Sequence, residues 1–304
     1  MIEYPYMPEG RELKHVPHDS TFMQAAKLAM EECAGDSNWP VGIVAVKDGE
    51  VVARAGNGFN RGPQGKHVCP RIVLGCKSGE GYDLCDVHDP AGHSELQLVK
   101  AMQEAGIDTN SADAYMYGHW WACEPCWTTL IGAGFRDLYV TDDAHERFTK
   151  EKVYGRTLQT TLKSAYIAGA ITGVFGEDGW EKRSGLYESV GEVCKEMGIK
   201  ACIPHRDNGE SEVGKEKDAK KVYEWSTQKA CDNDVVIAEV SLPSTGTGGE
   251  LVEAVHCAVP IVLLSEKGAH VSQFVIGNPN VRYHVEYESV EEACRKLRNV
   301  LRQL

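Results

Sequence analysis

Five residues of this 304-residue chain have the types and spacing of a metal-dependent active site. His93, Ser94 and Glu95 stand together, and a Cys-x-x-Cys pair, Cys123 and Cys126, follows. One imidazole and two thiolates are three of the ligands of a tetrahedral zinc ion, and a catalytic zinc keeps the fourth position open for water. Glu95 can then act as general acid and base for that water. The spacing predicts a catalytic zinc ion; a structural zinc site and unrelated cysteines are the alternatives.

The hydrophobic periodicity places these residues at the starts of two helices. Residues 92–105 have a helical period, which puts His93 and Glu95 in a first turn. The helix dipole there favours a carboxylate and a neutral imidazole, and ligation requires the neutral imidazole. A strand at residues 112–117 and a helix at 127–134 repeat the arrangement for the cysteine pair. We therefore expect two helix N-termini to face one metal ion.

The remaining elements of the first half are a helix, a hairpin and a strand. Residues 19–33 have a helical period, and residues 135–141 form an apolar run typical of a strand. An Asp-Gly pair between residues 40–45 and 50–55 predicts a β-hairpin. Asn57 follows the second hairpin strand, where it can be simply a turn residue.

Residues 61–89 are loop-like but rich in possible metal ligands. The segment contains, in order, His67, Cys69, Cys76, Cys85 and His88. Loops of this length are either functional or disordered. A structural zinc ion would replace the missing core, with Cys69, Cys76, Cys85 and His88 as possible ligands. Uncoordinated thiols are the alternative.

The composition is that of a globular chain with an acidic balance. Hydrophobic residues make up 42% and charged residues 25% of a length typical of two domains. The net charge of −13 argues against a nucleic-acid polymer as partner but leaves free nucleotides possible. The 11 cysteines lack the dense spacing of a disulfide scaffold and suit a reducing compartment. Without an apolar targeting segment or membrane span, we expect a cytoplasmic, soluble protein with no membrane partner.

Residues 18 to about 145 resemble the cytidine and deoxycytidylate deaminase superfamily. The resemblance rests on residues 44–49, 56–57, 93–95, 123–126 and 134–140. The zinc deaminase signature has a Pro directly before the first Cys, where this chain has Ala122. The resemblance implies an α/β/α sandwich, Zn²⁺ as cofactor and hydrolytic deamination of a cytosine ring.

The same resemblance implies roles for individual side chains. Glu95 would take a proton from water, deliver it to the ring N3 and finally protonate the departing ammonia. Asn57 would contact the sugar of the substrate. The cysteine-bearing insertion resembles the deoxycytidylate branch, in which an additional structural zinc occurs. Trp120 and Trp121 would either stack on a pyrimidine or belong to the core.

From residue 164 the pattern changes to alternating strands and helices, which predicts a parallel sheet with helices on both faces. A polar segment, residues 142–163, precedes it, and the expected domains are residues 1–160 and 161–304. The expected strands are residues 165–171, 199–203, 234–240, 260–264 and 281–284, and the expected helices 185–197, 217–231, 249–257 and 290–301. The fold class is therefore α/β, with a flavodoxin-like or Rossmann-like second domain whose ligands bind at the carboxyl ends of the strands.

Two glycine-rich segments stand at strand ends of the second domain. Residues 169–173 close its first strand, and residues 244–250 lie between its third strand and the next helix. Backbone N–H groups of such segments can bind a phosphate, and tight-turn structure is the alternative. Glu250, expected in the first helical turn, is poorly placed for a phosphate but well placed as a nucleophile at a sugar carbon.

Residues 238–251 closely resemble the nucleoside 2-deoxyribosyltransferase superfamily, especially its 2′-deoxynucleoside 5′-phosphate N-hydrolases, and the resemblance extends over about residues 164–303. It implies that Glu250 attacks C1′ with the help of a Tyr, for which Tyr187 is the best match. The 5′-phosphate would be held by Gly169, Ile171, Thr172, Ser244 and Gly246. Ser226 stands where the family has an Asp.

Together these features predict a bifunctional pyrimidine deoxynucleotide enzyme. The first domain would deaminate dCMP, or a 5-modified dCMP, to the corresponding dUMP. The second would hydrolyse the N-glycosidic bond of a deoxynucleoside monophosphate to free base and 2-deoxyribose 5-phosphate. A deoxyribosyltransferase and a non-catalytic nucleotide sensor are the alternatives for the second domain. Both families usually assemble as homo-oligomers, so we expect a homo-oligomer.

Overall fold

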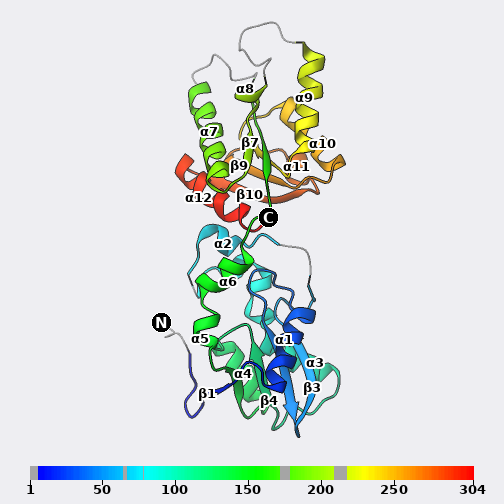
Figure 1. Ribbon diagram of the computed structural model, residues 1–304, viewed down its shortest axis with the longest axis vertical. Coiled ribbons are helices and arrows are strands. Elements are labelled where there is room, and N and C mark those ends of the chain that lie inside the picture. The colour runs from blue at the N-terminus through cyan, green and yellow to red at the C-terminus, as the bar shows by residue number, and fades with distance from the viewer. Residues whose placement is uncertain (1–5, 64–66, 78, 172–178, 209–217) are drawn as a thin grey trace. The chain divides into compact units, whose positions relative to one another are not determined.

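The computed structural model describes residues 6–63, 67–77, 79–171, 179–208 and 218–304. The chain divides into two compact units, Met1–Gln159 with Gln303, and Thr160–Arg302 with Leu304 (Figure 1). Each unit contains one five-stranded sheet. The α/β fold class expected from the sequence is confirmed for both.

The first unit is built on a mixed sheet with the strand order β1-β5-β4-β2-β3. Its strands are β1 (Leu13–Val16), β2 (Gly42–Lys47), β3 (Glu50–Gly56), β4 (Asp113–Tyr117) and β5 (Leu138–Thr141). β1, β5 and β4 are parallel, and β2 is antiparallel to both of its neighbours. The expected hairpin joins β2 and β3: Asp48 and Gly49 both have positive φ, 53° and 83°, as a type I′ turn requires.

Helices cover this sheet and position the candidate metal ligands. α1 (Thr21–Cys33) packs on β2, β3 and β4, α3 (Ser94–Glu104) packs on β2 and β3, and α4 (Glu124–Gly132) packs against α3. Gly42 allows α1 to approach β2 closely, because a Cβ there would lie 2.1 Å from the backbone N of Met30. This is the expected α/β/α sandwich.

Short elements connect these layers. They are α2 (Pro70–Leu74), α5 (Ala144–Arg147), α6 (Lys150–Thr157) and three 3₁₀ turns, η1 (Tyr82–Leu84), η2 (Asp86–His88) and η3 (Pro90–Gly92). The sequence pattern indicated neither β1 nor the helices within residues 142–163. β1 has no fully buried residue, and in the polar segment only Ala144, Phe148, Val153 and Leu162 among its apolar residues are buried, so periodicity is weak in both.

The second unit has an entirely parallel sheet with the order β10-β9-β8-β6-β7. The strands are β6 (Ser164–Ala168), β7 (Lys200–Cys202), β8 (Val235–Glu239), β9 (Ile261–Glu266) and β10 (Val281–Tyr287). Read from β7, the order is 2-1-3-4-5, which is the flavodoxin-like order. The expected topology is confirmed, and all five expected strands are present.

The helices of the second unit form two packed pairs. α7 (Trp180–Glu196) contacts α12 (Val290–Leu301), and α9 (Ala219–Asp232) contacts α10 (Thr245–His256); the pairs lie on the two faces of the sheet (Figure 1). The short helices are α8 (Pro204–Asp207) and α11 (Gln273–Ile276). A disulfide joins Cys231, on α9, to Cys257, directly after α10, so the expectation that the cysteines are thiols or metal ligands is wrong for this pair. Nowhere in the described residues is a helix both long and apolar enough to cross a membrane.

Candidate active sites

The first candidate site is formed where α3 and α4 begin. His93 is the N-cap residue of α3 and Cys123 the N-cap residue of α4, with Cys126 in the first turn of α4. His93 Nδ1 lies 3.4 Å from Cys123 Sγ and 3.3 Å from Cys126 Sγ, and the two sulfur atoms are 3.1 Å apart. The structure therefore brings together the three residues that the sequence indicated as zinc ligands.

The donor atoms of this cluster fit a zinc ion. Zinc bonds of about 2.0–2.1 Å to nitrogen and about 2.3 Å to sulfur give a nitrogen–sulfur edge of about 3.6 Å in a tetrahedron. Both nitrogen–sulfur distances are within about 0.3 Å of that edge. Hydrogen bonding from Cys126 lowers the pKa of Cys123, which favours the thiolate form needed for ligation. Three protein ligands leave the fourth position of the tetrahedron for water or substrate.

Glu95 lies beside this cluster on the buried face of α3. Its side chain is only 4% exposed. Ser94 Oγ donates a hydrogen bond to Glu95 Oε2 at 3.0 Å, which fixes the carboxyl orientation. Burial raises the pKa of Glu95, so its carboxyl group holds a proton more readily near neutral pH than an exposed one does. These are the properties of a group that both accepts and returns a proton.

The second candidate site is centred on Glu250 in the second unit. Ser244 caps α10, so the glycine-rich segment forms the first turns of the helix rather than a loop, and Glu250 lies in the second turn, not the first. Tyr166 on β6 donates a hydrogen bond to Glu250 Oε1 at 2.7 Å. Burial raises the pKa of Glu250 to about 7. The hydrogen bonds from Tyr166 and Ser226 lower this pKa, but their effect is smaller than that of burial. A carboxylate with this pKa is ionised only near and above neutral pH.

Tyr187, the residue expected to assist Glu250, is engaged elsewhere. Its hydroxyl donates to the carbonyl oxygen of Ala170 at 3.1 Å, and a Cβ at Gly169 would lie 2.4 Å from that hydroxyl. Gly169 is therefore explained by packing against Tyr187 alone. The sequence pattern did not indicate a functional role for Tyr166, because this residue stands in an apolar run, where an aromatic residue indicates a core position. Its hydroxyl is the only polar group of that run's side chains after Ser164, and this was the available signal.

The proposed phosphate-binding residues have mixed environments. Ser244 Oγ accepts hydrogen bonds from Thr247 N at 3.2 Å and Thr247 Oγ1 at 3.1 Å, so it acts as a helix cap. Gly246 has only Ser244 Oγ within 4 Å of a hypothetical Cβ, and Gly248 and Gly249 have no atom within that distance. Ile171 is described, whereas Thr172 lies outside the described residues. The glycines leave open space at the start of α10.

The part of the first unit that matches a known family includes His93, Cys123 and Cys126, called the His93 cluster below. Residues 16–142 match the family model of the cytidine and deoxycytidylate deaminase zinc-binding region. The other part of the chain is similar to a putative 2′-deoxynucleoside 5′-phosphate N-hydrolase 1 of Methanosarcina mazei, with 27% identity over 136 residues, 44% of this chain and 81% of the relative. The counterpart from Syntrophotalea carbinolica is 34% identical over 82 residues, 26% of this chain and 57% of the relative. The solved CMP N-glycosidase BcmB of Clostridium botulinum has a TM-score of 0.35 and 17% identity, covering 44% of this chain and 97% of its own.

Aromatic residues surround the cluster of His93, Cys123 and Cys126 in the first unit. His119 Nδ1 accepts a hydrogen bond from Trp121 N at 3.3 Å, and its ring lies 5.3 Å from that of Trp39. Burial and the nearby His93 lower the pKa of His119 to about 4, so it is neutral with its proton on Nε2. Trp120 packs against His145 with 4.6 Å between ring centroids. The sequence patterns gave no indication of His119, whose only signal was its position just before the cysteine pair.

The side chain of Asn57, the expected sugar contact, is hydrogen-bonded to the backbone of the first unit. Its Oδ1 accepts from Val41 N at 3.0 Å, and its Nδ2 donates to Trp39 O at 2.8 Å. These two bonds connect the end of β3 to the segment before β2. The side chain thus has a structural function in addition to any contact with a ligand.

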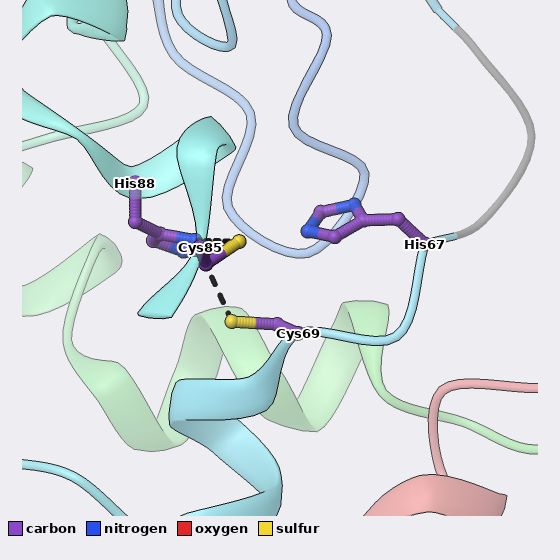
Figure 2. A group of neighbouring side chains, drawn as sticks. All are labelled: His67, Cys69, Cys85 and His88. Carbon is purple, nitrogen blue, oxygen red and sulfur yellow. Dashed lines mark hydrogen bonds between the residues drawn. The ribbon is translucent and has the colours of Figure 1, made fainter. Parts of the chain in front are cut away.

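A second group of side chains that could bind a metal ion lies in the insertion before α3. Figure 2 shows this second cluster, which consists of His67, Cys69, Cys85 and His88. Three of its members were expected, but Cys76 is not part of it, and His67 takes that place. Cys69 caps the N-terminus of α2, whereas Cys76 follows Gly75 at the opposite end, so the two cysteines are separated by the length of the helix. His67 was present in the same segment but its sequence position gave no reason to prefer it over Cys76.

Proposed function

We propose that the chain is a two-site pyrimidine nucleotide enzyme that deaminates a cytosine nucleotide in the first unit and hydrolyses an N-glycosidic bond in the second. The buried Glu95 beside three convergent metal ligands is the observation that carries the proposal. The name of the curated relatives, 2′-deoxynucleoside 5′-phosphate N-hydrolase, supports the second activity. The preferred substrate is dCMP or a 5-modified dCMP.

In the deamination, Glu95 would handle every proton. A zinc ion at His93, Cys123 and Cys126 supplies Lewis acidity, which makes water a nucleophile near neutral pH. Glu95 takes a proton from the attacking water and delivers it to N3 of the ring. Glu95 then takes the proton of the new C4 hydroxyl and passes it to the amine, the C4–N bond breaks, and ammonia leaves. Ser94 keeps the carboxyl group in one orientation during both transfers.

In the glycosidic cleavage, Glu250 would act as the nucleophile. One carboxylate oxygen accepts the Tyr166 hydrogen bond, which leaves the other for attack on C1′. The C1′–N bond breaks, and the base leaves with a proton from solvent. Water then hydrolyses the glycosyl ester, which releases 2-deoxyribose 5-phosphate and restores the carboxylate. The open start of α10 would receive the 5′-phosphate through its backbone N–H groups.

The decisive experiment incubates the full chain with dCMP and follows ammonia, dUMP and free base together by chromatography. Glu95→Gln should abolish ammonia release while keeping its metal, and Glu250→Gln should abolish base release while keeping deamination. Ammonia production by Glu95→Gln at the wild-type rate would refute the first assignment. Base release by Glu250→Gln would refute the second.

A nucleotide-sensing second unit is a second candidate. The observation in its favour is Ser226, which hydrogen-bonds Glu250 from the position where the N-hydrolase family has an Asp. A sensor would bind deoxynucleoside monophosphate without releasing base and would change the deaminase kinetics. Transfer of deoxyribose to an added second base would instead identify a deoxyribosyltransferase. We further propose a cytoplasmic location and a homo-oligomeric assembly, which size-exclusion chromatography with light scattering would test.

A further inference from the structure

The helix α9 packs on the second unit with very few buried side chains. Of its 14 residues only Ala230 is buried, and Trp225 is half-buried against the apolar core. On the other face of the sheet, α7 buries 7 residues and α12 buries 5. Because most helix stability in a protein comes from packing of an apolar face, packing alone fixes α9 less firmly than the helices of the other face.

The disulfide between Cys231 and Cys257 attaches α9 to its neighbour α10. Cys231 lies in the last turn of α9, Cys257 is the C-cap residue of α10, and their Cα atoms are 5.4 Å apart. Cys257 is exposed and Cys231 half-buried, so a small thiol can reach the bond. The other nine cysteines of the chain are free. In a reducing compartment, which free cysteines suit, a disulfide is usually transient and catalytic or redox-sensing.

The two helices joined by this disulfide also carry both partners of a contact at the second candidate site. Ser226 is on α9, little more than one turn before Cys231, and Glu250 is on α10, about two turns before Cys257. Ser226 hydrogen-bonds to the carboxyl group of Glu250. A movement of α9 relative to α10 would therefore separate this pair.

Trp225 gives α9 a second connection to the same site. Its ring packs edge-on against that of Tyr166, with 6.3 Å between the ring centroids. Tyr166 in turn donates to Glu250 at 2.7 Å. The position of α9 thus affects Glu250 directly through Ser226 and indirectly through Tyr166.

We propose that the disulfide between Cys231 and Cys257 is a redox switch of the Glu250 site. In the oxidised form the bond holds α9 against α10 and keeps Ser226 on Glu250. In the reduced form α9 is released, and cleavage of the N-glycosidic bond slows. The effect on cleavage rests on the proposed function, whereas the release of α9 does not.

Reduction of the bond by a small dithiol is a thiol–disulfide exchange. A thiolate of the reductant attacks the exposed sulfur of Cys257, the S–S bond breaks, and Cys231 leaves as a thiolate and takes a proton. The second thiolate of the reductant attacks the mixed disulfide, and Cys257 leaves in the same way. The dithiol supplies two electrons and two protons and becomes a disulfide, and exchange with an oxidised dithiol reverses the reaction.

Amide hydrogen exchange of the full-length chain tests the release of α9. The oxidised chain is compared with the chain reduced by tris(2-carboxyethyl)phosphine, and thiol titration of the unfolded chain should give 9 thiols for the oxidised form and 11 after reduction. Reduction should speed exchange in residues 219–232 about tenfold, whereas residues 290–301 of α12 should be unchanged. Equal exchange of α9 in the two forms would overturn the proposal.

Release of free base from dUMP gives the second readout. Reduction should lower the rate at pH 7 about tenfold, the effect of losing one hydrogen bond to a carboxylate. The double variant Cys231→Ser/Cys257→Ser should have the low rate with or without the phosphine. Cys294→Ser, which removes a free thiol on α12, is the matched control and should keep the response to reduction.

The two readouts separate failure of the switch from failure of the proposed function. A chain that releases base at the same rate in both forms has no switch, whatever the exchange of α9. A chain that releases no base in either form refutes the N-glycosidic activity instead, and the hydrogen exchange of α9 then decides whether the disulfide holds this helix.

Discussion

Replacing Tyr166 with Phe should move the pH dependence of base release. Tyr166 donates to Glu250 at 2.7 Å, and this bond stabilises the ionised carboxylate. A hydrogen bond to a charged group contributes about 1.5–3 kcal/mol, and 1.36 kcal/mol corresponds to one pKa unit, so its loss should raise the pKa by about 1–2 units. The folded-state pKa of Glu250 is about 7, so the midpoint should move to about 8–9.

The rate of base release by Tyr166→Phe at neutral pH should fall, because Glu250 must be ionised to act as the nucleophile. At pH 7 the ionised fraction would fall from about one half to between about 10% and 1%, which lowers kcat/KM about 5-fold to 50-fold. The difference in kcat/KM between the wild type and Tyr166→Phe should become smaller as the pH approaches 9. The assay is initial-rate release of free base from dUMP, measured by chromatography between pH 5.5 and 9.5.

Tyr187→Phe is the matched control for this experiment. Its hydroxyl bonds to the backbone of Ala170 rather than to Glu250, so its removal should leave the midpoint near pH 7. A midpoint that stays in place in Tyr166→Phe and moves in Tyr187→Phe would refute the reasoning and restore Tyr187 as the assisting residue.

Two further predictions concern stability and substrate affinity. Glu250→Gln should stabilise the protein by about 1–3 kcal/mol at pH 8 but not at pH 4, as measured by urea unfolding. The reason is that the folded-state pKa of Glu250, about 7, exceeds the unfolded value of 4.5, so the wild type loses stability as the pH rises from 4.5 to 7. Equal stabilisation at both pH values would contradict this. We also propose that the Nε2–H of His119, beside the His93 cluster, donates a hydrogen bond to the bound nucleotide. His119→Phe keeps a ring against Trp39 but removes this donor, so KM for a cytosine nucleotide should rise about fivefold, the equivalent of about 1 kcal/mol, with zinc content unchanged. His119→Gln, which retains a donor, should recover most of that loss, and an unchanged KM in His119→Phe would exclude the contact.

The sequence was most informative where function depends on local spacing. His93 and Glu95 are neighbours along the chain, and the cysteine pair is recognised by its own spacing, so residue type alone indicated the site. The parallel sheet of the second unit was equally visible, because its buried strands are continuous apolar runs such as residues 235–238. Both patterns are properties of short segments.

Relations between distant segments could not be seen in this way. Tyr166 reaches Glu250 across 84 positions, and an aromatic residue in an apolar strand looks the same whether or not its hydroxyl has a partner. His67 joins the second cluster only after the insertion has turned back on itself. The disulfide between Cys231 and Cys257 likewise depends on the packing of α9 against α10. Tertiary packing decided each of these.

The glycines at the start of α10 imply a compromise between the stability of the helix and the space for a ligand beside it. Gly248 and Gly249 are inside a helix, and each has empty space where a β-carbon would be. Alanine at both positions should make the helix more stable by about 1–2 kcal/mol, because glycine loses more backbone freedom on folding. A search for thermostable variants would therefore select these two substitutions early. If the vacant space admits a ligand, the same variants would gain heat resistance and lose affinity together, so the two properties could not be optimised independently at this helix end.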